Sequence, residues 1–249
     1  MTEAWDNIKI LPDKSSAVRY AAERITRLAT ATLQVNETFS IALSGGSTPK
    51  PVYEMLGTTF DEHLDWSRIH LWWGDERAVS PDHEDSNYRM VKEALLDQID
   101  IPDANVHRIR GEDDPQSAAE AYEQELADFF GDGEYFDLNL LGMGGDGHTA
   151  SLFPHTDAVH ESDKMVIAHH VEAKGGLTRI SLTFPAILKS ANMMFLVTGD
   201  GKADALYEVL EGDYQPDVYP SQVIVHSDHQ YVVWVVDEAA AVKLPEKED

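Results

Sequence analysis

The chain contains no cysteine, few positively charged residues and no long apolar run. The absence of cysteine excludes disulfides, thiolate metal ligands and cysteine nucleophiles. Because no stretch of about 18 or more apolar residues occurs, the sequence offers no candidate for a membrane-spanning helix. Residues 1–9 lack the apolar segment of a secretory signal, and we therefore expect a cytoplasmic location.

The charge balance is strongly acidic, with 45 Asp and Glu residues, 19 Lys and Arg residues and a formal net charge of −26. A nucleic-acid partner would usually require a basic patch, and an anionic membrane surface would repel the chain. Like-charged copies also repel one another, which favours a monomer. If the ligand is an anion, a few positioned cations must overcome the overall field.

Length and composition fit one α/β domain that spans residues 1–249. Hydrophobic residues make up 43% of the chain, enough for a substantial core. Strand-like apolar segments alternate with amphipathic helical segments, a pattern typical of a parallel sheet that is buried on both faces. We therefore expect an α/β fold with a doubly wound, mostly parallel sheet and helices on both faces.

The periodicity of apolar residues predicts individual elements. Residues 14–31 and 117–130 read as the longest helices, the second with Ser117 as its N-cap and Glu120 three residues on. Shorter helices are expected over 49–56, 88–96, 185–190, 202–210 and 238–241. Strands are expected over 39–43, 69–73, 136–141, 180–183, 192–198 and 231–236.

Four Gly-rich or polar clusters directly follow predicted strands, and they begin at Ser44, Gly74, Gly142 and Gly199. Ligands of open α/β sheets bind outside the carboxyl ends of the strands. The four clusters can therefore converge on one crevice, although they are far apart in the chain.

Two of these clusters are candidates for phosphate binding. Residues 44–49 (Ser-Gly-Gly-Ser-Thr-Pro) join a predicted strand to a predicted helix. The backbone of the turn at Ser44, Gly45 and Gly46 can therefore approach an anion that lies at the N-terminus of this helix. Neither the Walker A nor the G-x-G-x-x-G spacing is present, which argues against a nucleotide. Lys202 falls in the first turn of a predicted helix, where a cation is unfavourable unless an anion lies there. An ordinary tight turn and a solvated lysine remain the simpler alternatives.

The other two clusters carry charged and titratable side chains. Asp75 and Arg77 follow the second predicted strand and can orient hydroxyls or neutralise an oxyanion, or form a surface ion pair of little energetic value. Arg179 is a further candidate cation. His148 lies in a loop that follows a buried strand, and its ordinary pKa suits base catalysis near neutrality. Asp146 can fix the tautomer of His148 or orient a water molecule. No spacing indicates a metal site or a serine triad.

Taken together in order, these stretches resemble the 6-phosphogluconolactonase family, within the glucosamine-6-phosphate deaminase and ribose-5-phosphate isomerase-like group. The resemblance runs from about residue 39 to about residue 210. The matching stretches are 44–49, Trp-Gly-Asp-Glu-Arg at 73–77, Asp-Ser-Asn-Tyr at 85–88, 141–154, Arg179 with Ser181 and Thr183, and Gly201 with Lys202.

The resemblance implies hydrolysis of 6-phospho-D-glucono-1,5-lactone to 6-phospho-D-gluconate in the oxidative pentose phosphate pathway, without a required cofactor or metal. By position, it implies that His148 activates water with support from Asp146, and that Asp75 and Arg77 orient the substrate. It also implies that Arg179, Lys202 and the turn at Ser44, Gly45 and Gly46 bind the phosphate.

Two other functions remain open at this stage. The nearest alternative is an isomerase or deaminase of phosphosugars that uses the same crevice. The related deaminases carry a similar Asp-Gly-His loop, but a carboxylate a few residues later assists their ring opening, and residues 149–154 contain none. A non-catalytic phosphosugar sensor would keep the cations and glycines but would need no base. Loss of turnover with retained ligand binding on replacement of His148 distinguishes an enzyme from a sensor.

Overall fold

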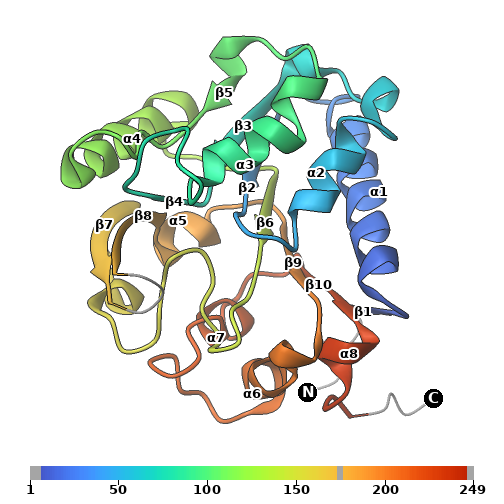
Figure 1. The fold of residues 1–249 in the computed structure, drawn as a ribbon, viewed down its shortest axis with the longest axis vertical. Coiled ribbons are helices and arrows are strands. Elements are labelled where there is room, and N and C mark those ends of the chain that lie inside the picture. Colours follow the sequence, from blue (N-terminus) through green and yellow to red (C-terminus); the bar gives the residue numbers. More distant parts are fainter. Residues whose placement is uncertain (1–6, 173–175, 246–249) are drawn as a thin grey trace.

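A computed structural model describes residues 7–172 and 176–245 (Figure 1). Residues 1–6, 173–175 and 246–249 lie outside this description. The expectation that residues 1–9 carry no secretory signal therefore concerns a segment that lies mostly outside the described residues. Among the described residues, no helix is both long enough and apolar enough to cross a bilayer.

The main sheet has seven strands among the described residues, in the order β1-β10-β9-β6-β2-β3-β5, and each neighbouring pair is parallel. The strands are β1 (Ile8–Leu11), β2 (Phe39–Leu43), β3 (Ile69–Trp73), β5 (Val106–His107), β6 (Leu138–Leu141), β9 (Met193–Val197) and β10 (Val232–Asp237). The central strands β2, β6 and β9 are buried along their whole length, which explains why their sequences are apolar except at Ser40 and Asn139. The predicted mostly parallel α/β fold is confirmed.

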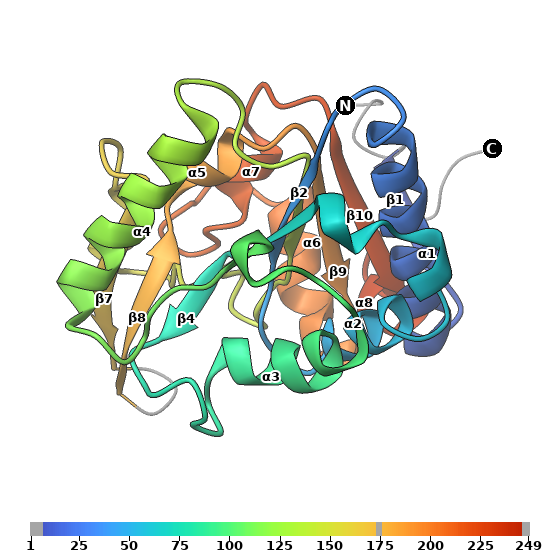
Figure 2. The same ribbon diagram turned by 90° about the horizontal axis from the view of Figure 1, so that it is seen from above.

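Helices cover both faces of this sheet, and Figure 2 shows α1 and α4 on opposite sides of it. The helices are α1 (Lys14–Thr32), α2 (Lys50–Leu56), α3 (Asn87–Ala94), α4 (Pro115–Phe130), α5 (Phe184–Leu188), α6 (Ala203–Glu211), α7 (Gln222–Val225) and α8 (Glu238–Ala241). Helix α1 buries one stripe that includes Val18, Ala22, Ile25 and Ala29, at the spacing expected of an amphipathic helix. Short 3₁₀ turns connect several of the elements.

The start of helix α4 differs from the prediction. Ser117 is not the N-cap; the helix begins at Pro115, and the Asp114 carboxylate accepts hydrogen bonds from the Ser117 N–H at 3.0 Å and from its hydroxyl at 2.9 Å. Aspartate is as good an N-cap as serine, and proline is favoured in the first turn because it has no N–H to satisfy. The Asp-Pro pair therefore determines where the helix starts.

A second sheet of three antiparallel strands was not predicted. Its order is β4-β8-β7, with β4 at Asp75–Arg77, β7 at Val166–Val171 and β8 at Leu177–Leu182. The predicted strand over 180–183 is the end of β8. Strand β4 consists of three charged residues and is separated from β3 by Gly74 alone, so no apolar pattern marks it. This small sheet packs against α4 and brings β4 and β8 to the carboxyl edge of the main sheet (Figure 1).

Candidate active site

The four predicted clusters meet because the strands that precede them are neighbours. Strands β9, β6, β2 and β3 lie side by side and parallel, so their carboxyl ends reach the same edge. In the sheet, β3 is the neighbour of β2 on one side, and β6, which comes later in the chain, is its neighbour on the other side. This reversal between β2 and β6 is a topological switch point, where open α/β sheets form their ligand crevices.

A cavity of about 250 Å³ lies at this edge. Eight of the sequence-predicted site residues line it: Ser44, Gly45, Gly46, Asp75, Arg77, His148, Arg179 and Lys202. The ninth, Asp146, is bonded to His148. Sequence reasoning assigned no role to Ser151 or Phe153, which also line the cavity.

The first glycine turn is held by a tyrosine that sequence reasoning missed. The buried Tyr53 hydroxyl, on α2, accepts from the Ser44 N–H at 2.9 Å and donates to the Ser44 carbonyl at 2.7 Å. Gly46 has a φ of +100°, a conformation that side chains rarely adopt. The turn is thus fixed at the end of β2, with its backbone facing the cavity. Nothing in the sequence distinguishes Tyr53 from an ordinary core tyrosine.

His148 and Asp146 form a hydrogen-bonded pair in the loop after β6. The Asp146 carboxylate contacts His148 Nδ1, so it favours the tautomer with the proton on Nδ1 and leaves Nε2 as the basic nitrogen. The Phe153 ring packs against the imidazole with 4.2 Å between the ring centroids. A Cβ at Gly144 would lie 2.1 Å from His148 Nδ1 and 2.2 Å from the Asp146 carboxylate, so only glycine leaves room for the pair.

Two arginines lie opposite each other on the neighbouring strands β4 and β8. Arg77 and Arg179 are partners in the antiparallel register, and Arg179 is buried. Burial lowers the pKa of Arg179, and the charge of Arg77 lowers it further, while Asp75 acts in the opposite direction. Within the described residues, Arg77 Nε and Arg179 Nη1 are buried and have no hydrogen-bond partner. Buried donors of this kind are suited to an anionic ligand.

The two carboxylates of β4 have different surroundings. Asp75 lines the cavity, and its Oδ2 accepts from the Ser151 hydroxyl at 2.7 Å. Glu76 is not among the residues that line the cavity, and it is only 2% exposed. Burial raises the pKa of Glu76, partly offset by the backbone N–H groups of the next helix that bond to its carboxylate. Glu76 therefore organises the loop that follows β4.

Lys202 ends a 3₁₀ turn over Asp200–Lys202 and occupies the N-cap position of α6, one position before the helical turn that the sequence predicted. The turn is anchored by Asp237, whose carboxylate accepts from the Gly199 N–H at 2.9 Å and from the Ala240 N–H at 2.9 Å. This anchor places the lysine at the edge of the cavity. Within 7–172 and 176–245, no group of three or more His, Asp or Glu side chains is arranged as metal ligands.

Residues 12–234 match the family model described as glucosamine-6-phosphate isomerases/6-phosphogluconolactonase. The chain belongs to this family. It is 41% identical over 242 residues to a 6-phosphogluconolactonase of Synechocystis sp., a match that covers 95% of this chain and 98% of that protein. Identity to the 6-phosphogluconolactonase of Mycobacterium tuberculosis is 38% over 247 residues, covering 96% and 98%.

Solved structures agree with this assignment. A 6-phosphogluconolactonase from Trypanosoma cruzi superposes with a TM-score of 0.84 at 28% identity, covering 96% of this chain and 97% of the other. A monomeric glucosamine-6-phosphate deaminase superposes with a TM-score of 0.79 at 24% identity, covering 95% and 99%. The second likeness shows the shared fold alone, so the choice between lactone hydrolysis and deamination depends on the site.

Proposed function

We propose that the chain hydrolyses 6-phospho-D-glucono-1,5-lactone to 6-phospho-D-gluconate in the oxidative pentose phosphate pathway, with His148 as the base that activates water. One observation carries this proposal. The His148 imidazole, with Asp146 on Nδ1, shares a single cavity with the guanidinium groups of Arg77 and Arg179. A base and an anion-binding pair in one cavity fit hydrolysis of a phosphorylated lactone.

In this mechanism His148 Nε2 removes a proton from water while the water oxygen attacks the lactone carbonyl carbon. The carbonyl electron pair moves onto oxygen, and Arg77 stabilises the oxyanion. When the carbonyl re-forms, the bond from C1 to the ring oxygen breaks, and the imidazolium of His148 returns its proton to the departing oxygen. Asp146 stabilises the imidazolium between these steps. The product is a carboxylic acid, which ionises in water.

The phosphate lies far from the reacting carbon and provides binding energy for orientation. We assign it to Arg179, Lys202 and the turn at Ser44, Gly45 and Gly46, while Asp75 orients the sugar hydroxyls. The amides of that turn and the two cations converge from β2, β8 and the turn after β9. Because one cavity draws on segments from 44 to 202, we also propose that residues 1–249 act as a single domain.

Deamination of a phosphosugar is the nearest alternative. The loop after His148 carries Thr149, Ala150 and Ser151, without a carboxylate that could assist ring opening. The name that both of these relatives carry also favours the lactonase. We therefore expect the purified protein to consume the lactone and to release no ammonia from glucosamine-6-phosphate.

Replacement of His148 by Ala tests the proposal. We expect kcat for the lactone to fall by roughly 10²- to 10⁴-fold, the usual contribution of a general base. The Kd for 6-phosphogluconate should stay within about threefold of the wild type, because the cations remain. Stopped-flow lactone consumption corrected for the uncatalysed reaction, and calorimetric titration, measure the two quantities. Unchanged hydrolysis would refute the assignment of His148, and 6-phosphogluconate binding without any hydrolysis by the wild type would favour a sensor.

A further inference from the structure

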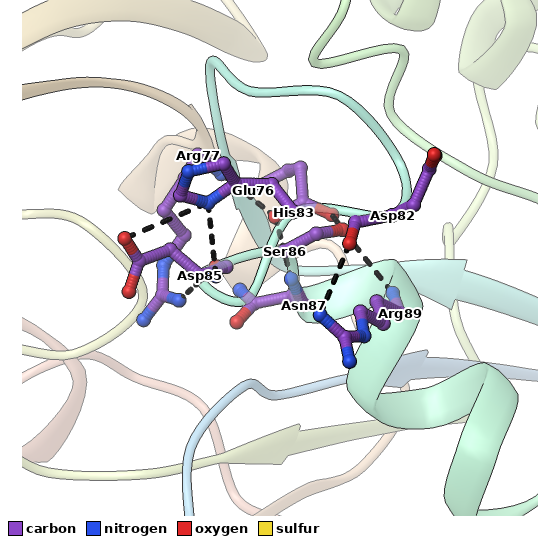
Figure 3. Close-up of polar contacts among 8 residues, drawn as sticks. All are labelled: Glu76, Arg77, Asp82, His83, Asp85, Ser86, Asn87 and Arg89. Carbon is purple, nitrogen blue, oxygen red and sulfur yellow. Dashed lines mark hydrogen bonds and ion pairs between the residues drawn. The ribbon is translucent and has the colours of Figure 1, made fainter.

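Asn87 lies between two walls of the cavity without lining it. It is the first residue of α3 and is 2% exposed. Its N–H donates to Glu76 Oε1 at 2.7 Å, and the Arg77 N–H donates to the same oxygen at 2.8 Å (Figure 3). The Tyr88 N–H donates to the other oxygen of this carboxylate, Oε2, at 2.8 Å. Glu76 thereby fixes the backbone of Asn87 relative to β4. The amide side chain has little freedom to move.

The side chain of Asn87 bonds to the carboxylate that faces the cavity. Its Nδ2 donates to the Asp75 carbonyl at 2.8 Å and to Asp75 Oδ1 at 3.2 Å. The Ser151 hydroxyl donates to the other oxygen, Oδ2, at 2.7 Å. With a donor on each oxygen, the plane of the Asp75 carboxylate is set by Asn87 and Ser151.

The other side of the same amide packs against the first glycine turn. A Cβ at Gly45 would lie 2.0 Å from Asn87 Oδ1 and 2.3 Å from Asn87 Cγ. Gly45 has no positive φ, so the obstacle to a side chain there is the amide itself. Asn87 therefore contacts both the turn after β2 and the carboxylate after β3.

We propose that Asn87 is a positioning residue that acts through Asp75, with its amide holding the carboxylate in the orientation that receives the sugar. The proposal rests on the lactonase function proposed above. The position requires an uncharged donor, since a second carboxylate would repel Asp75 and an alanine would leave Oδ1 without a donor. The amide must also be flat and fixed to fit against Gly45.

The isosteric change Asn87→Asp gives a signature in the pH profile. Two carboxylates about 3 Å apart share one proton, so one apparent pKa of the pair rises. The protonated form can again donate to Asp75. We expect the ratio of variant to wild-type kcat/KM to increase severalfold as the pH falls from about 8 to about 6. The same ratio for Asn87→Ala should stay constant. Dividing by the wild-type profile removes the titration of His148.

A double-mutant cycle identifies the residue through which Asn87 acts. Asn87→Ala should lower kcat/KM by about tenfold in the wild type, the effect of losing one hydrogen bond to a charged group. In an Asp75→Ala background the same change should cost less than about twofold. Ser86→Ala is the matched control, because that hydroxyl caps the same helix at Arg89 N and bonds to Glu76, as Figure 3 shows. The control should lower the melting temperature and leave kcat/KM within about twofold.

Equal losses in both backgrounds, or parallel pH profiles for the two Asn87 variants, would overturn the proposal and leave Asn87 with a structural role. The proposal can still be tested if the Asn87→Ala protein folds poorly, because Asn87→Asp keeps the shape of the side chain. Its kcat/KM relative to the wild type is compared between high and low pH in the same variant. Failure of the proposed function looks different. In that case the wild type would not hydrolyse the lactone, or His148→Ala would remain active.

Discussion

Arg77 and Arg179 are paired across the β4–β8 ladder, with like charges on directly opposed residues. Such pairs are destabilising in a sheet unless other charges compensate. Asp75, Asp85 and Glu76 compensate in part, since each favours the charged form of Arg179. Arg77 Nη1 also donates to the Asp85 carbonyl (Figure 3). Buried donors remain on both guanidiniums within the described part of the chain. A phosphate or an oxyanion would satisfy them.

Removing a phosphate-binding cation should affect substrate binding more than chemistry. For Arg179→Ala and Lys202→Ala we expect KM to rise by roughly tenfold or more with kcat changed by less than about threefold, because both side chains are assigned to the non-reacting phosphate. Steady-state kinetics with the lactone measures both constants. Arg110→Ala, which removes an exposed cation paired with Asp113, is the control for the change in net charge. A loss restricted to kcat would mean that the cation acts at the carbonyl instead.

Asp146→Asn should reduce kcat while the substrate still binds. The amide keeps the size of the carboxylate, but it no longer stabilises the imidazolium and it can turn its NH₂ toward Nδ1, which favours the wrong tautomer. We expect kcat to fall by about 10²-fold with little change in KM. Asp163→Asn, at an exposed position, provides the comparison. Wild-type kcat in Asp146→Asn would show that the pair has no role in the proton transfer.

Gly144→Ala should displace the His148–Asp146 pair. The new Cβ would lie within 2.3 Å of atoms in both side chains, so they must shift. A shift of about 1 Å at a reacting group can cost roughly 10²-fold in rate, and we expect a fall of at least about tenfold in kcat/KM. Gly201→Ala is the matched control, since a Cβ there meets nothing within 4 Å. Similar losses in the two variants would indicate that loop flexibility, rather than this contact, governs activity.

Much of the fold could be predicted because the central strands are buried on both faces. Mostly apolar segments such as Phe39–Leu43 and Met193–Val197 have few alternative structures. The apolar residues of a helix such as Lys14–Thr32 recur at helical spacing. The second sheet could not be predicted in the same way. Asp75–Arg77 has the composition of a surface turn, and it is a strand only because Leu177–Leu182 pairs with it. That pairing is a long-range contact which no local pattern encodes.

The residues of the site also differ in whether a local sequence pattern or a long-range contact determines their role. Residues whose chemistry follows from a strand-end position, such as His148, Arg77 and Lys202, could be placed at one sheet edge before any coordinates were known. Tyr53 and Asn87 could not be assigned roles, because each acts through a contact with a turn or carboxylate from another part of the fold. The roles of the lining residues remain predictions for the variants above to test.

Acid should destabilise the fold partly through His70, on β3. His70 Nδ1 lies 3.0 Å from His107 Nε2, and His107 Nδ1 lies 2.6 Å from Glu125 Oε1. Burial, and then the neighbouring His107, lowers the pKa of His70 from its ordinary value of 6.5. Below about pH 6.5 the unfolded chain therefore binds the proton more readily than the folded one, and stability falls with pH until the folded pKa is reached.

The measurement is the free energy of unfolding from urea titrations between about pH 8 and about pH 5, for the wild type and His70→Gln. Protonation of His70 disfavours the folded state in acid. In His70→Gln the free energy of unfolding should therefore decrease less steeply below about pH 6.5 than in the wild type. The difference in slope should stay below the roughly 1.4 kcal/mol per pH unit that one full proton gives, because the ring is partly in solvent. His226→Gln, which removes an exposed ring outside this cluster, is the control. Parallel curves for the wild type and His70→Gln would show that His70 titrates alike in the folded and unfolded chains.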